Sequence, residues 1–133
     1  MKTVTLVDPQ GNGHEMILSA DNGGDIHLWD ATGKKSSHSC NSHLVYLDVV
    51  MVSPGTYFFA TADYMGNVTL FGLTVGGIQM LGAIESYVNP GFKNPRENST
   101  GVFADFFLKQ FGGKPYIFLI TVQGEICVYS YQL

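Results

Sequence analysis

The sequence predicts an all-β protein made of three repeated antiparallel units. One short segment occurs three times, as GDIHLWD, MGNVTLFG and QGEICVYS, at residues 24–30, 65–72 and 123–130. Gly24 and Gly66 lie 42 residues apart, and the strand residues on either side of them fall into register at that offset. Gly124 lies 58 residues beyond Gly66, because a polar segment of 16 residues, 86–101, separates the second and third copies.

This period is typical of the blades of a β-propeller, in which short strands form four-stranded antiparallel meanders. Side chains alternate along a strand, so each copy places two sets of residues on opposite faces. One face carries Ile26, Leu28 and their equivalents, and the other carries Trp29, Phe71 and Tyr129. Both faces are apolar, as expected of a blade packed between two neighbours. The sequence therefore predicts a β-propeller fragment of three antiparallel meander blades; the alternative is another small antiparallel β protein with similar hairpins.

The first blade is predicted over residues 1–42. Its strands are expected at residues 4–7, 15–20 and 25–30, followed by an outer edge strand within residues 34–42. The turn-forming stretches DPQGNG and DNGG separate the first three strands. The outer segment, KKSSHSCNS, is polar, and polar edges keep sheets from pairing edge to edge.

The second and third blades are predicted over residues 43–85 and 102–133. Strands of the second are expected at residues 44–52, 57–62, 67–74 and 78–84. Strands of the third are expected at residues 102–109, 116–122 and 125–133, so this blade lacks its last strand. The inserted loop between the two blades, residues 86–101, is long for a connection without structure of its own, and such loops are commonly functional or disordered.

Composition narrows the classes of function. The chain has 133 residues, 45% of them hydrophobic and 14% charged, which is typical of a folded domain. A net charge of −4 with seven Lys and Arg argues against a nucleic-acid partner, since phosphate binding needs clustered cations. No apolar run approaches the roughly 20 residues of a membrane span, and no signal peptide is expected. The compartment stays open, and Asn98 would be a glycosylation site only in an exported chain.

The third strand of the first copy ends in Trp29-Asp30, and this dipeptide resembles the signature of WD-repeat blades. Phe71-Gly72 and Tyr129-Ser130 stand at the equivalent places and depart from that signature. The resemblance covers essentially the whole chain. It implies an interaction scaffold, in which rigid blades present loops and edges to protein partners.

The same resemblance implies a buried hydrogen-bond chain that links a His, a Ser or Thr, an Asp and a Trp within a blade. The first blade offers Ser19, Asp21 and Trp29, and the second offers His43, Thr61 and Asp63. The third offers Thr121 but neither the Asp nor the Trp. We expect these side chains to have a structural role in holding hairpins rather than a catalytic one.

Residues 8–15, DPQGNGHE, resemble the calcium loop of FG-GAP propellers, in which an Asp-rich and Asn-rich hairpin wraps a cation. Asp8, Asn12 and Glu15 would supply oxygen ligands. Gln10 and Asn12 stand where carboxylates are expected, and the spacing is one residue short. A solvated turn is therefore favoured over a metal site.

No catalytic or cofactor-binding motif is present in the sequence: there is no nucleophile elbow, no phosphate-binding glycine loop and no supported pair of carboxylates. His38, Cys40 and His43 lie close together but match no zinc-binding spacing. We therefore expect a non-enzymatic scaffold without a cofactor. Two alternatives remain, a calcium-stabilised FG-GAP-type adhesion module and a fragment of a quinoprotein-like propeller enzyme.

Two features point to partners. A three-blade array leaves an apolar face bare at each end, whereas propellers close with about four to eight blades. We therefore expect the chain to be part of a larger propeller or to complete one by associating with protein partners or further blades. The inserted loop is the expected contact surface, because loops on rigid frames tend to carry recognition. Its candidate contact residues are Tyr87, Phe92, Lys93 and Arg96.

Overall fold

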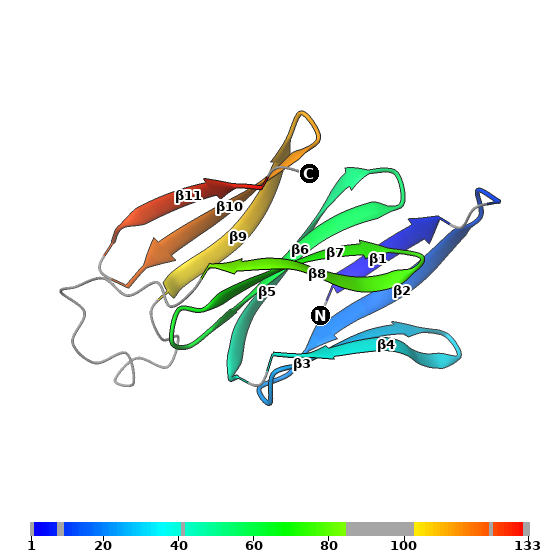
Figure 1. Ribbon diagram of the computed structural model, residues 1–133, viewed down its shortest axis with the longest axis horizontal. Helices are drawn as coiled ribbons and strands as arrows, with labels where there is room; N and C mark the ends of the chain where they lie inside the picture. Colours follow the sequence, from blue (N-terminus) through cyan, green and yellow to red (C-terminus); the bar gives the residue numbers. More distant parts are fainter. Residues whose placement is uncertain (1, 8–9, 41, 85–102, 123, 132–133) are drawn as a thin grey trace.

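The computed structural model describes residues 2–7, 10–40, 42–84, 103–122 and 124–131, which form antiparallel β-sheets joined by tight turns (Figure 1). The expected all-β class is confirmed for this part of the chain. No helix of membrane-spanning length and hydropathy occurs among the described residues. The inserted loop, with Tyr87, Phe92, Lys93 and Arg96, lies outside them.

The strands form three separate sheets. The first sheet contains β1 (Lys2–Val7), β2 (Gly13–Ala20), β3 (Asp25–Asp30) and β4 (Gly33–Ser39), in that order. The second sheet contains β5 (Leu44–Ser53), β6 (Thr56–Asp63), β7 (Val68–Thr74) and β8 (Gly77–Ile84), in that order. The third sheet has the order β11-β10-β9 and contains β9 (Phe103–Phe111), β10 (Lys114–Thr121) and β11 (Ile126–Ser130). Each strand end lies within three residues of its expected place.

The second sheet packs between the other two, and two hydrophobic cores result (Figure 1). We call forward the face of each sheet that carries Ile26 and Leu28, Val68 and Leu70, or Ile126 and Val128. We call backward the face that carries Trp29, Phe71 or Tyr129. One core joins the forward face of the first sheet to the backward face of the second. The other joins the forward face of the second sheet to the backward face of the third.

Strand β6 shows why this stack forms. Phe58, Ala60 and Ala62 point forward into the core with the third sheet, and all three are fully buried. Phe59 alternates with them and points backward, where its ring stacks on Phe71 with centroids 4.7 Å apart. A strand that is apolar on both faces is stable only when a neighbour covers each face.

Hydrogen bonds between sheets fix the stack along β1, β5, β6 and β9. The Asp48 carboxylate on β5 accepts the Leu108 backbone N–H of β9 at 2.8 Å. The Tyr46 hydroxyl on β5 donates to the Phe103 carbonyl oxygen at 3.1 Å. On the other side, the Tyr57 hydroxyl accepts the Thr5 backbone N–H at 3.0 Å. Such bonds to particular backbone groups define the offset of neighbouring sheets, which apolar packing alone leaves loose.

The two outward faces of the stack differ, and the expectation of an apolar face at each end is wrong for the first sheet. Its backward face is mostly polar, and its large apolar side chains are Ile17 and Trp29, exposed at 39% and 38%. Glu15, Ser19, Asp25, His27 and Ser37 make up much of the rest. The third sheet, in contrast, presents an apolar forward face. Polar side chains at alternate positions of β2, β3 and β4 are the physical reason for the difference.

Removing the Phe58 side chain should destabilise the fold strongly. Phe58 is fully buried in the core between the second and third sheets, and the centroid of its ring lies 5.4 Å from that of the Tyr131 ring. We expect Phe58→Ala to lower the free energy of unfolding by about 3–5 kcal/mol in urea titrations, because a large cavity remains. Met51→Ala is the control, since Met51 is 52% exposed on the same sheet. Equal effects of the two substitutions would contradict the packing of these sheets.

Candidate interaction surface

The forward face of the third sheet is built from alternate residues of its three strands. Cross-strand register places Phe107, Phe118 and Val128 in one row, and Asp105, Ile120 and Ile126 in the next. The Phe107 and Phe118 rings stack with centroids 4.9 Å apart and planes 7° from parallel. Aromatic rings therefore form the centre of this face, and aliphatic side chains form its β11 side.

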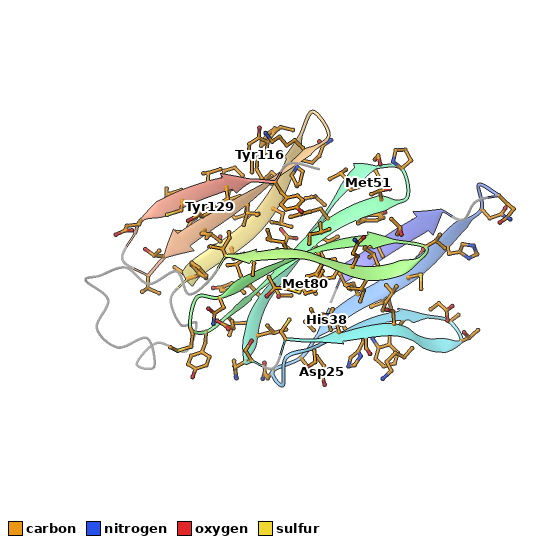
Figure 2. All side chains as sticks on the ribbon, in the orientation of Figure 1. Asp25, His38, Met51, Met80, Tyr116 and Tyr129 are labelled. Atoms are coloured by element: carbon orange, nitrogen blue, oxygen red, sulfur yellow. The ribbon has the colours of Figure 1, made fainter. Side chains whose placement is uncertain are left out.

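A second aromatic pair extends the face toward the β9–β10 hairpin. Phe111 meets Tyr116 edge to face with centroids 5.4 Å apart. Tyr116 lies on β10, close to this hairpin (Figure 2). Phe111 is 58% exposed, and the exposed Lys109 lies beside Tyr116 across the strands. An apolar centre with charged residues at its border is the usual anatomy of a protein interface.

Equivalent positions in the other sheets show how unusual this exposure is within the chain. Ile26 and Val68 are fully buried, whereas Ile126 at the matching place is 68% exposed. Leu28 and Leu70 are 2% and 6% exposed, whereas Val128 is 52% exposed. In the first two sheets the next sheet covers these side chains. Among the described residues, no sheet covers them in the third, and contiguous exposed apolar surface marks interaction sites.

Sequence reasoning anticipated an uncovered face but missed its aromatic composition. The available signal was the alternation of Tyr116, Phe118 and Ile120 along one strand with Phe107 on the preceding one. A strand with apolar side chains on both faces is predicted to be buried on both sides. The sequence pattern does not show which of the two faces a neighbouring sheet covers.

All three repeats close the hairpin after their second strand with the same turn. Gly24, Gly66 and Gly124 adopt positive φ values of 94°, 93° and 88°, which favour glycine. The N–H of each glycine donates to the carbonyl oxygen three residues earlier, at 3.0–3.2 Å. These are hairpin loops that end in a left-handed glycine.

The side chain that opens each turn accepts a hydrogen bond from the N–H four residues further on. Asp21 Oδ1 accepts from Asp25 at 3.0 Å, and Asp63 Oδ1 accepts from Asn67 at 2.8 Å. In the third repeat the Thr121 hydroxyl accepts from Glu125 at 3.1 Å. Thr121 therefore occupies the place of the aspartate, where sequence reasoning found no equivalent residue.

The residues of the second sheet that the sequence predicts to be structural make separate contacts. The Asp63 carboxylate, only 2% exposed, accepts the N–H groups of Met65 and Asn67 and the Asn67 side-chain amide. The buried Thr61 hydroxyl lies 4.0 Å from the Cys40 sulfur. His43 is exposed, and its ring meets Tyr64 edge to face at 5.6 Å.

In the first sheet the expected Ser19 and Trp29 are joined directly, since the indole Nε1–H donates to Ser19 Oγ at 2.8 Å. Asp21 belongs instead to the turn. These contacts hold β2 to β3 on the backward face of the first sheet, and they involve no group poised to react with a ligand.

The group of His38, Cys40 and His43 does not converge on one point. The His38 ring packs on Phe71 with centroids 5.0 Å apart, whereas the His43 ring packs on Tyr64. Burial raises the pKa of the Cys40 thiol, and the hydrogen bond with Thr61 offsets part of this rise. A thiol that stays protonated at neutral pH is a poor metal ligand and a poor nucleophile.

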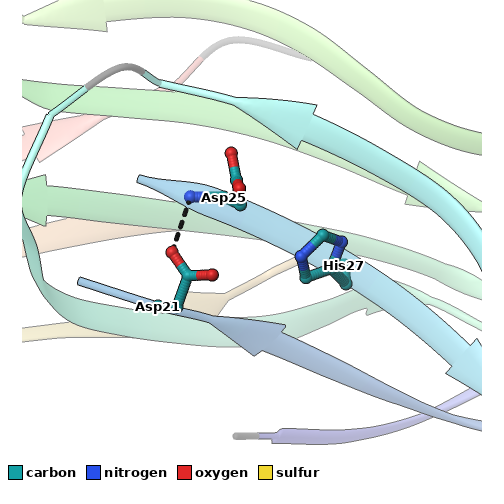
Figure 3. A group of neighbouring side chains, drawn as sticks. All are labelled: Asp21, Asp25 and His27. Atoms are coloured by element: carbon teal, nitrogen blue, oxygen red, sulfur yellow. Dashed lines mark hydrogen bonds between the residues drawn. The ribbon is translucent and has the colours of Figure 1, made fainter. Parts of the chain in front are cut away.

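Asp21, Asp25 and His27 do converge, with one potential ligand atom from each lying within 4.8 Å of the others (Figure 3). His27 Nδ1 is buried and has no hydrogen-bond partner. Calcium takes about six to eight oxygen ligands and structural zinc takes four, so three side chains fall short of either. The expected calcium ligands are elsewhere: Asn12 and Glu15 are exposed, and Asp8 lies outside the described residues.

Removing the Asp63 carboxylate should cost far more than removing its counterpart in the first repeat. Asp63→Ala removes the acceptor of three partly buried hydrogen bonds, and we expect a loss of about 3 kcal/mol in unfolding free energy. Asp21→Ala is the matched control: Asp21 is exposed and accepts one such bond, so about 0.5–1 kcal/mol is expected. Chemical denaturation measures both. A smaller loss for Asp63→Ala than for Asp21→Ala would contradict this assignment.

No protein-family model matches this sequence, and no curated protein matches it either.

Proposed function

We propose that this chain is a non-enzymatic protein–protein interaction scaffold whose three sheets are blades of a larger or assembled β-propeller. One observation carries the proposal. Ile126 and Val128 are mostly exposed, although the residues at the same places in the other two sheets lie in hydrophobic cores. The forward face of the third sheet is therefore the surface on which a partner docks.

The two interfaces inside the chain indicate what such a partner looks like. In each, an apolar forward face meets a backward face that presents an aromatic residue of the third strand, Phe71 or Tyr129. A partner that repeats this arrangement is another antiparallel sheet with apolar side chains on its backward face. It would come from another molecule or from another part of a longer polypeptide.

We also propose that the three sheets are blades of the WD-repeat or FG-GAP-like type. The common hairpin turn supports it, because three copies close in one way around Gly24, Gly66 and Gly124. The link between Ser19 and Trp29 adds support in the first repeat. The departures at Phe71-Gly72 and Tyr129-Ser130 leave the two families equally open.

A charge placed on the forward face of the third sheet should remove its ability to associate. We expect the wild-type chain either to exceed its 14.5 kDa monomer mass in sedimentation velocity or to bind a hydrophobic dye as a monomer, since the exposed apolar surface must be covered or remain accessible. Ile126→Lys should abolish the association or reduce the dye signal several-fold.

Met51→Lys is the control, because Met51 has comparable exposure but lies on the second sheet. It should leave both readouts unchanged. A wild-type monomer that binds no dye would overturn the proposed function, and so would equal effects of the two lysine substitutions.

A further inference from the structure

The third sheet differs from the other two at one edge. The first and second sheets each have a fourth strand beside the third, namely β4 and β8. In the third sheet, β11 occupies the position of β3 and β7, and among the described residues no strand pairs with its outer side. An unpaired edge presents a row of backbone N–H and C=O groups that can template another strand.

The backbone groups on that edge can be identified. Glu125 accepts from Thr121, and Tyr131 donates to Pro115, so these odd-numbered residues direct their backbone groups toward β10. Backbone hydrogen bonds alternate in direction along an antiparallel strand. Ile126, Val128 and Ser130 therefore direct their N–H and C=O groups outward. At the matching places of the second sheet, Val68 and Leu70 pair with Ile84 and Gly82 of β8.

A cleft on the second sheet provides an independent observation. It has a volume of about 400 Å³, and its lining includes Val52, Phe58 and Leu81, which belong to the core that the second and third sheets share. In the first sheet, the fourth strand reaches the next sheet: Ser36 of β4 comes within 3.5 Å of a Cβ placed on Gly77 of β8. A strand beside β11 would lie over β8 in the same way, at the border of this cleft. The matching cleft beside β4, whose lining includes His14, Met16 and Ser36, is smaller, at about 290 Å³.

We infer that the outer edge of β11 accepts an extended strand from a partner polypeptide, paired antiparallel, which completes the third sheet. The inference deepens the proposed function and rests on it, because it names the form in which a partner joins this blade. The strand β11, ICVYS, contains neither a charged residue nor proline, which are the residues that normally prevent pairing at edges.

The structure also defines the register and chemistry of the donated strand. The ladder shifts between Leu28 and Trp29 in the first sheet and between Leu70 and Phe71 in the second. The equivalent place in β11 lies between Val128 and Tyr129, so the donated strand forms a bulge there. Because none of the described residues that line the cleft is charged, the donor resembles the uncharged β8, GIQMLGAI, rather than the basic β4, GKKSSHS.

Hydrogen exchange on the full chain tests this inference. The probe is a synthetic peptide with the sequence of residues 76–84, which includes β8, and the control peptide has the sequence of residues 33–39. With the first peptide, we expect the amides of Ile126, Val128 and Ser130 to exchange at least about tenfold more slowly, because they gain acceptors. The amides of Cys127 and Tyr129, which already face β10, should change little.

Two substitutions at one site separate the backbone from the side chain. Val128→Pro removes the outward N–H while leaving the ladder to β10 intact, and proline is tolerated at sheet edges. Val128→Thr changes the side chain but keeps the donor. We expect Val128→Pro to abolish the protection by the peptide and Val128→Thr to retain it. The wild-type measurement stands even if the proline variant does not fold.

Each other outcome counts against the inference. Absence of protection in the wild type overturns it, and so does equal protection by the control peptide. Protection of the same amides without peptide, together with a dimer mass, would assign the edge to a second copy of the chain and overturn the assignment to another polypeptide. If Ile126→Lys abolishes association while the wild-type edge gains no protection, the proposed function holds and this inference fails.

Discussion

Burial of β6 on both of its faces is the constraint on which the rest of the structure depends. Its forward side chains fill one core and its backward side chains fill the other, and most of them are inaccessible to solvent. A single sheet with two apolar faces cannot be stable alone in water, because each face needs a cover. The first and third sheets supply those covers, and the cross-sheet bonds of Tyr57, Tyr46 and Asp48 then fix their positions.

Most of the strand positions could be predicted from the sequence because they depend on local signals. The offset that relates Gly24 to Gly66 marks two hairpins, and alternation between them defines which side chains share a face. The hairpin turns require a positive φ at their glycines, independently of how the sheets pack. Such signals identify the strands and their faces without any knowledge of how the sheets stack.

The candidate surface depended on information that the local pattern does not contain. Ile126 and Val68 look alike in sequence, and only the presence or absence of a covering sheet separates an exposed side chain from a buried one. The role of Thr121 was missed for a related reason: a hydroxyl replaces a carboxylate as the acceptor in the turn, and the register of the repeat had to be seen in three dimensions. The convergence of Asp21, Asp25 and His27 likewise follows from the turn geometry.

The unequal ends of the stack give it a direction. On the first sheet, hydrogen-bonding side chains such as Ser19 and Asp25 keep the outer face hydrated, and adding a sheet there would require their desolvation. On the third sheet, burial of the Phe118 and Ile126 side chains lowers the free energy, because it removes apolar surface from water. The proposed association would therefore extend the stack at the third sheet and not at the first.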